Sequence, residues 1–242
     1  MAQKKTDPMI EKVAREGLFG RSPDEMGRLK PAPDRNFHNG NGNGAGMSLE
    51  QKLFQKVSFG TLDELNVVLS QGPIVDTRDG QFNTPLMRAS ASGRDEMVST
   101  LLAVNAGVNL QNNEGRTALM ETVSKGYDHI ASLLARAGAD PNIKNNNGMT
   151  ALMYAARNNR VQSLHVLASH DADLDLQNNN GETAIMIAAA QGHYKCVEEL
   201  AHLGADLSLK NNAQLTAIEI AGQNGEEDIV LFLTGFVKFE PL

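Results

Sequence analysis

The sequence contains nearly the same nine residues three times at one fixed spacing. NNEGRTALM starts at residue 112, NNNGMTALM at 145 and NNNGETAIM at 178, so the interval between successive copies is constant. The same interval extends in both directions through five threonines, Thr84, Thr117, Thr150, Thr183 and Thr216. A fixed period of about 20 to 50 residues is typical of chains whose units stack on their neighbours. The period therefore predicts a stack of repeated units.

A second marker keeps the same register and divides each unit into two helices. In residues 116–148, Thr117 can cap a first helix, and Gly126 suits the left-handed residue that commonly ends one. A second helix with apolar residues at helical spacing then ends near Gly138, and an Asn-rich turn follows. The glycine recurs at the same place after each threonine position except at Asn159, which also tolerates this conformation; the marker glycines are Gly60, Gly93, Gly126, Gly192 and Gly225.

The stretches GRTALMETVSKGYDHIASLLARAGADPN and GETAIMIAAAQGHYKCVEELAHLGAD resemble ankyrin repeats over roughly residues 48 to 242. The resemblance implies an all-α fold, a solenoid of about six stacked helix-turn-helix units with projecting β-turns. One departure is that methionine, or Glu219 in the last unit, stands where the family usually has histidine. Because the imidazole hydrogen bonds are lost, we expect looser coupling between turns. The methionines are Met87, Met120, Met153 and Met186.

The chain divides into two regions. Residues 1–47 are rich in Pro, Gly and charge, and we expect a disordered tail ending in a Gly/Asn linker. Residues 48–242 form the repeat domain, with units at about 49–82, 83–115, 116–148, 149–181, 182–214 and 215–242. Gln214 replaces the turn glycine found at Gly115, Gly148 and Gly181, so we expect it at positive φ, with the last unit fraying first.

The end of the sequence leaves two alternatives open. We expect the last helix to end near Leu233, followed by the apolar segment Phe236–Leu242. This segment either folds back over the exposed end of the stack or contacts a second copy or another protein. Otherwise we expect a monomer.

Composition excludes several classes of function. The net charge is −7, and the repeats have no basic stripe, which argues against nucleic acid as a partner. No apolar run reaches the roughly 20 residues that span a bilayer, so we expect no membrane partner and a cytoplasmic location. With one cysteine no internal disulfide forms, and Cys196 falls at a core position of a second helix, which predicts a buried thiol.

Catalytic and metal-binding patterns are also missing from the sequence. His165 and His170 do not stand at a helical spacing that would place both on one face. The acidic run from Asp171 to Asp175 resembles a calcium loop, but Leu176 stands where that loop needs glycine. We therefore expect no enzyme activity, no cofactor and no metal site.

The resemblance implies instead that a protein partner binds the concave surface formed by the turns and first helices. Most positions on that surface are neutral, and the exceptions cluster in the middle units, where Tyr, Arg and Met are types enriched in interface centres. The basic residues there predict a partner with an acidic rim. The function is then that of a non-catalytic adaptor, scaffold or inhibitor; the alternative is a secreted effector or immunity-type protein that uses the same surface. The candidate contact residues are Arg116, Glu121, Lys125, Met149, Tyr154, Arg157, Asn158 and Glu182.

Overall fold

The computed structural model describes residues 46–239, and within that range it contains helices and turns but no strand. The expected all-α solenoid is confirmed. The expected disordered tail, apart from its last two residues, lies outside the described range. The helices pair in chain order: α3 (Leu49–Phe59) with α4 (Leu62–Leu69), α5 (Pro85–Ala91) with α6 (Asp95–Ala103), α7 (Ala118–Lys125) with α8 (Asp128–Arg136), α9 (Ala151–Arg157) with α10 (Val161–Ala168), α11 (Ala184–Ala190) with α12 (Tyr194–His202), and α13 (Ala217–Gln223) with α14 (Glu227–Phe239).

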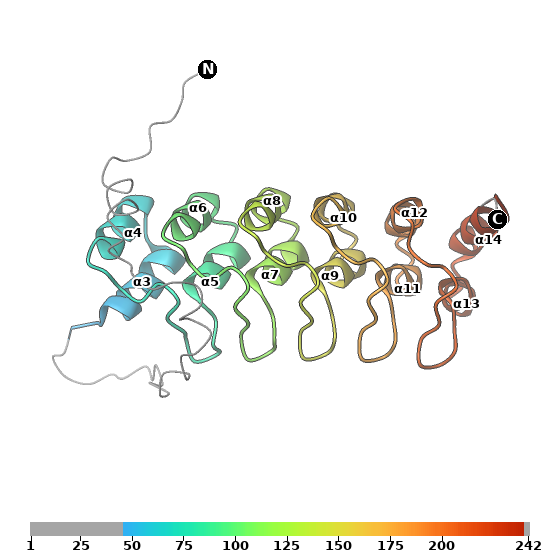
Figure 1. The fold of residues 1–242 in the computed structure, drawn as a ribbon, viewed down its shortest axis with the longest axis horizontal. Coiled ribbons are helices and arrows are strands. Elements are labelled where there is room, and N and C mark those ends of the chain that lie inside the picture. The colour runs from blue at the N-terminus through green and yellow to red at the C-terminus, as the bar shows by residue number, and fades with distance from the viewer. Residues whose placement is uncertain (1–45, 240–242) are drawn as a thin grey trace, which may run out of the picture.

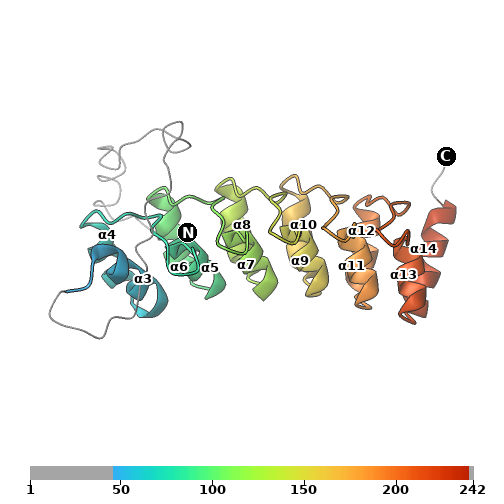
Figure 2. The same ribbon diagram turned by 90° about the horizontal axis from the view of Figure 1, so that it is seen from below.

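The first and second helices of the pairs form two layers (Figure 1). The inner layer contains α3, α5, α7, α9, α11 and α13, which lie side by side in Figure 2, and the outer layer contains the other described helices. Turns that we call fingers project from the inner layer to one side; they comprise residues 79–83, 112–116, 145–149, 178–182 and 211–215. We call the face made by the fingers and the inner helices the inner surface.

The repeated threonines and glycines set the ends of most inner helices as the sequence predicts, but Gly60, which ends α3, has φ −86° and is not left-handed. The Thr117 hydroxyl accepts a hydrogen bond from the Met120 amide at 3.3 Å, and the same cap is made by Thr84, Thr150 and Thr216 but not by Thr183. Gly126 has φ 80°, and Asn159, which replaces the glycine in the next unit, has φ 54°. Both residues therefore adopt the left-handed conformation that lets the chain turn into the outer helix.

The core lies between the two layers and continues from one unit to the next. Leu119, Leu152 and Ile185, at equivalent positions of three inner helices, are each 1 % exposed. Cys196 on α12 is fully buried, as expected, and burial raises the pKa of its thiol to about 11. The thiol therefore stays protonated at neutral pH and packs as a small apolar side chain.

Each finger is closed by the side chain of its first residue. Asn145 Oδ1 accepts from the amides of Asn147 and Met149 at 3.0 and 2.8 Å. A side-chain oxygen of Asp79, Asn112, Asn178 and Asn211 makes the same pair of bonds in the other fingers. This is the Asx-type turn that favours Asn and Asp.

The fingers are joined to one another by asparagines. The Asn146 amide donates to the Glu114 carbonyl at 3.0 Å, and Asn146 Nδ2 donates to the Asn113 carbonyl at 2.8 Å. Asn179 and Asn212 repeat both bonds in the next two fingers. The Met87 and Met153 sulfurs do not link fingers, because each accepts a hydrogen bond from the threonine amide at the start of its own helix. The looser coupling between turns that the sequence suggests stays a prediction.

The last helix differs from the expectation. α14 does not end near Leu233 but continues to Phe239, so the chain up to that residue does not fold back. The Phe236 ring instead packs against His202 of α12, with ring centroids 5.4 Å apart. The physical reason is that residues 234–239 contain no proline to end the helix, and Phe236 packs along the neighbouring α12. Residues 240–242 lie outside the described range.

Candidate functional site

Three of the expected contact residues meet in the middle of the inner surface. The Arg116 guanidinium lies over the Tyr154 ring, with its central carbon 4.8 Å from the ring centroid. Arg116 Nε also lies 3.0 Å from Glu121 Oε1, in a geometry that makes an ion pair but not an aligned hydrogen bond. Arg116 belongs to a finger, Glu121 to α7 and Tyr154 to α9. The cluster therefore spans two neighbouring units.

The next finger holds Tyr154 from its other end. Asn145 Nδ2 donates to the Tyr154 hydroxyl at 3.0 Å, while Asn145 Oδ1 closes its own finger. The ring is half-buried and packs against the core. Since Arg116 covers one face of the ring and Asn145 binds its hydroxyl, the ring is oriented before any partner arrives. A side chain held in this way loses little conformational entropy on binding.

Met149 is placed differently from the expectation. It is 6 % exposed, so it offers almost no surface to a partner, and its sulfur accepts a 3.5 Å hydrogen bond from Asn178 Nδ2. The next finger, through Asn178, contacts the Met149 sulfur, and the side chain packs into the core. Glu182 at the equivalent position remains half-buried and accepts from the same Asn178 Nδ2 at 2.8 Å.

Lys125, Arg157 and Asn158 lie at the opposite end of the inner helices from the fingers. All three side chains are exposed, and neither basic residue forms an ion pair among the residues whose side chains are described. Asn158 Nδ2 donates to the Tyr154 carbonyl at 2.7 Å and so caps the end of α9. Of the eight expected residues, Arg116, Glu121 and Tyr154 thus form a neutralised cluster beside the fingers, and Lys125 and Arg157 form a separate basic edge at the far end of α7 and α9.

A second ion pair on the inner surface lies at the first finger. Arg88 makes two bonds to Asp79 Oδ2, at 2.9 and 2.6 Å, in the first finger. Burial disfavours ionisation of Asp79, but hydrogen bonds from Arg88 and Asn83 outweigh it and hold the pKa of Asp79 below its ordinary value. Lys125 and Arg157 form no ion pair among the described side chains, and neither do the acidic Glu182 and Glu219, so the inner surface carries unpaired charge of both signs.

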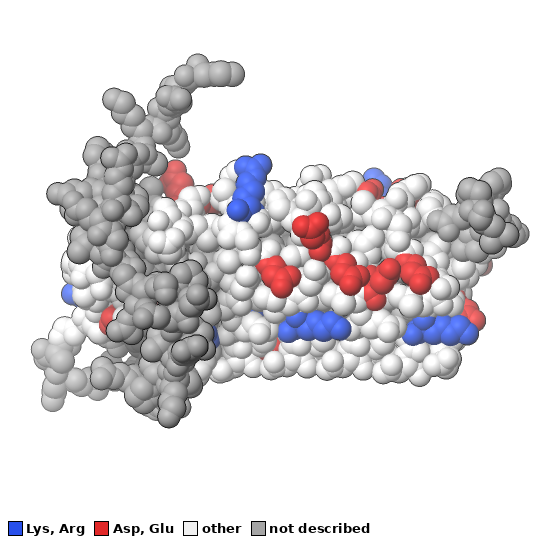
Figure 3. Space-filling view, viewed as in Figure 1, with Lys and Arg blue, Asp and Glu red and all other residues white. Residues whose placement is uncertain are grey.

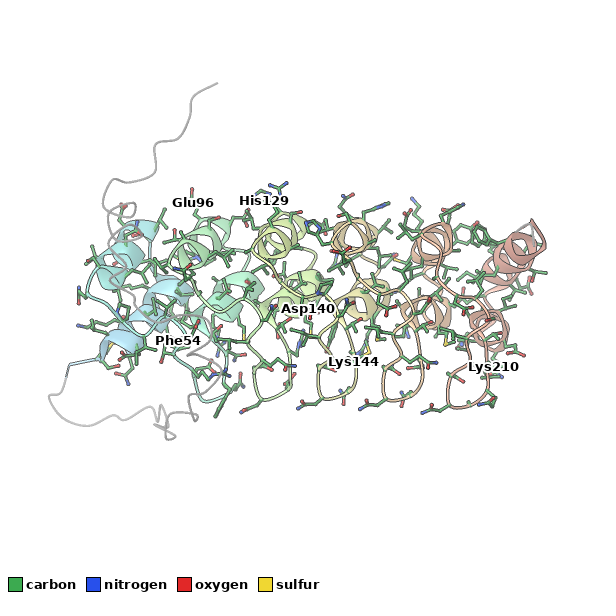
Figure 4. All side chains as sticks on the ribbon, viewed as in Figure 1. Phe54, Glu96, His129, Asp140, Lys144 and Lys210 are labelled. Atoms are coloured by element: carbon green, nitrogen blue, oxygen red, sulfur yellow. The ribbon has the colours of Figure 1, made fainter. Side chains whose placement is uncertain are left out.

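Acidic side chains gather on the side of the stack where each outer helix connects to the next finger. Asp140, Asp173 and Asp206 are exposed at equivalent positions of successive units, and Figure 3 shows a row of acidic side chains on this face. Lys144 and Lys210 lie below that row, toward the fingers, as the labelled side chains in Figure 4 show. Lys144 Nζ donates to the Gln177 carbonyl at 2.7 Å, so it ties two units together.

Sequence reasoning missed the asparagines that organise the cluster. Asn145 and Asn178 each close a finger and also donate to a candidate contact residue, Tyr154 or Glu182. A signal was present in the period, because the residues that close the fingers recur at the same interval as the threonines; they are Asp79, Asn112, Asn145, Asn178 and Asn211. Nothing in the sequence indicated which side chain each Nδ2 group would face.

A family model described as ankyrin repeats in three copies matches the chain in overlapping segments, at residues 53–145, 86–178, 120–211 and 166–238. Together the matches cover more than half of the chain. It belongs to the ankyrin-repeat family. Members of this family are generally protein–protein interaction modules and are typically not catalytic. Comparison with curated proteins finds no match.

Two further features concern only the described part of this ankyrin-repeat chain. None of its helices has the length and apolar character needed to cross a membrane. It also contains no group of three or more His, Cys, Asp or Glu side chains arranged to hold a metal ion.

Proposed function

We propose that this protein is a non-catalytic adaptor, scaffold or inhibitor that binds a protein partner on the inner surface around α7 and α9. The observation that carries the proposal is the Arg116–Tyr154 stack, braced by Glu121 and Asn145. Arg and Tyr are among the types most enriched at the energetic centres of interfaces, and this pair is already oriented. Arg116 contributes a flat contact surface here rather than net charge, because Glu121 neutralises it.

The partner we propose has an apolar pocket or helix face for the Tyr154 region and acidic residues on its rim. The acidic rim would face Lys125 and Arg157, the two exposed basic side chains at the far end of the inner helices. Exposed charges of this kind mainly raise the association rate and do so less at high salt, because ions screen them within about 10 Å.

The test begins by identifying the partner with the full-length chain. A photocrosslinking amino acid is placed at position 125, on the inner surface, and in a second protein at position 96 on the outer helix α6. We expect a covalent protein adduct from position 125 and not from position 96. The identity of the adduct also separates an adaptor of the same cell from the alternative, a secreted effector or immunity-type protein.

Variants then test the surface with the purified partner. Tyr154→Ala should weaken binding by about 2 kcal/mol. Arg157→Glu should slow association, whereas Arg136→Glu on the outer helix α8 makes the same charge change and should not. Thr216→Ala removes a helix cap and should lower stability by about 1 kcal/mol without changing affinity. If Tyr154→Ala binds as tightly as the parent protein while remaining folded, the site is elsewhere.

A further inference from the structure

The outer layer changes character at its last helix. The outward-facing position that is Ser99, Ser132, His165 and Glu198 in successive outer helices becomes Leu231 in α14. Leu231 is 76 % exposed. The end unit of a repeat stack normally presents polar residues to water, because no further unit covers it. An apolar residue appears here at the position where the neighbouring units are polar.

Leu231 forms the edge of an open hollow between α12 and α14. The hollow has a volume of about 410 Å³ and is lined by Tyr194, Asp228, Leu231 and Phe232. The Tyr194 and Phe232 rings meet edge to face, with centroids 5.5 Å apart and planes at 63°. Phe236 continues this row at 5.7 Å from Phe232. The aromatic surface thus runs along the two outer helices, which lie side by side at the C-terminal end of Figure 1.

The hollow combines this apolar surface with acidic groups. Glu226, Glu227 and Asp228 lie around the start of α14, and none of them forms an ion pair among the residues whose side chains are described. Lys195 is the one lysine of α12 and is likewise exposed and unpaired there. The acidic charge at this edge of the hollow is therefore not neutralised by a neighbouring basic side chain.

We propose that the hollow between α12 and α14 is a second docking site, which takes an amphipathic helix of another protein with an apolar anchor flanked by Lys or Arg. The anchor would contact Leu231 and the aromatic row, and the basic residues would face Asp228 and Glu227. Amphipathic helices commonly bind in apolar grooves in this way, and exposed apolar patches with polar rims mark interaction sites.

Two other occupants fit less well. A small molecule would lose little of its surface to water in an open hollow with four lining residues. A second copy of this chain, docked through the same hollow, would bring two acidic rims together, which is unfavourable. The hollow is on the outer layer, whereas the Arg116–Tyr154 cluster is on the inner surface. The protein could therefore hold two partners at once.

The experiment uses the full-length chain and synthetic helical peptides with a fluorescent label. The first peptide is an amphipathic Leu/Lys helix, the second replaces every Lys with Glu, and the third has the Leu/Lys composition in a non-amphipathic order. Binding is measured by fluorescence anisotropy. The key variant is Leu231→Ser, which restores the residue found at Ser99 and Ser132. Its matched control is Ile74→Ser, which changes a 67 % exposed apolar residue in the first unit.

We expect the amphipathic Leu/Lys peptide to bind more tightly than the other two. Leu231→Ser should weaken it about tenfold, and Ile74→Ser should leave it unchanged. Asp228→Asn should weaken it and reduce its salt dependence. Equal binding of the Glu peptide or the reordered peptide overturns the proposal, as does a Leu231→Ser protein that binds like the parent. A dimer in sedimentation that Leu231→Ser dissolves and Ile74→Ser does not would overturn it too, by assigning the hollow to a second copy.

Discussion

Gly148 tests whether close contact between fingers, rather than backbone conformation alone, requires glycine in the turns. A Cβ on Gly148 would lie 2.7 Å from the Asn179 amide nitrogen and 2.6 Å from its Oδ1, which belong to the next finger. Gly138 is a matched control because it has a similar φ, 85° against 75°, and a Cβ there would meet nothing within 4 Å. Both glycines can be changed to alanine.

The backbone contributions to the free energy of unfolding are the same for the two substitutions. Positive φ costs an L-residue roughly 1 to 2 kcal/mol, and the lower entropy of the unfolded alanine chain offsets part of it. Gly148→Ala must in addition displace the next finger, which weakens the two bonds that Asn179 makes to the carbonyls of Asn146 and Asn147. At about 1 kcal/mol per hydrogen bond, Gly148→Ala should be less stable than Gly138→Ala by about 2 kcal/mol.

Urea unfolding of the full-length chain measures the difference, and hydrogen exchange of the Asn179 amide locates it. We expect faster exchange at Asn179 in Gly148→Ala and parental exchange in Gly138→Ala. Equal loss of stability in the two variants would refute the reasoning, because backbone strain alone would then account for the glycine.

Three further predictions concern other positions. Gln214 has φ 63° and no following finger, so Gln214→Gly should slow hydrogen exchange in α13 and α14 by up to about fivefold. Burial raises the pKa of Asp76, although a hydrogen bond from the Gly107 amide acts in the opposite direction. The folded state therefore binds a proton at Asp76 more readily than the unfolded state does. The contribution of Asp76 to stability falls as the pH rises through its folded pKa. Asp76→Asn should therefore raise the melting temperature at neutral pH, with the gain shrinking as pH falls toward 3.8. Cys196 should react with a thiol reagent only as fast as the protein opens, and equal reactivity in folded and urea-unfolded protein would contradict its burial.

The period predicted most of the fold because each marker has a local physical reason. Thr117 and Gly126 mark a helix by capping and by left-handed geometry, which depend on neighbours in the sequence. Gln214 was expected at positive φ for the same reason, and this is confirmed. The predicted end of the last helix was wrong because the period supplies no marker after the last unit, and the length of α14 depends on packing against α12.

The candidate site was less predictable, because side-chain partners come from different units. Equivalent positions before the threonine that begins each inner helix hold Arg116, Met149 and Glu182, yet Met149 is buried while the other two are partly exposed. Arg116 was expected to add positive charge, but Glu121 neutralises it. The spacing in the sequence determines which residues occupy equivalent positions in successive units. It does not determine the direction in which a long side chain points between two fingers.

The two proposed sites differ in the units that carry them. The Arg116–Tyr154 cluster joins two units that have neighbours on both sides. The hollow lies between α12 and α14, and α14 belongs to the last described helix pair, which follows the Gln214 turn and has one neighbour among the described units. Local opening in a repeat stack is easiest at an end, because an end unit has only one interface to break. A ligand in the hollow would bind only the closed form of α14 and would therefore stabilise the end of the stack. The Arg116–Tyr154 cluster does not depend on a ligand for stability in this way, because the two units that form it each pack against neighbours on both sides.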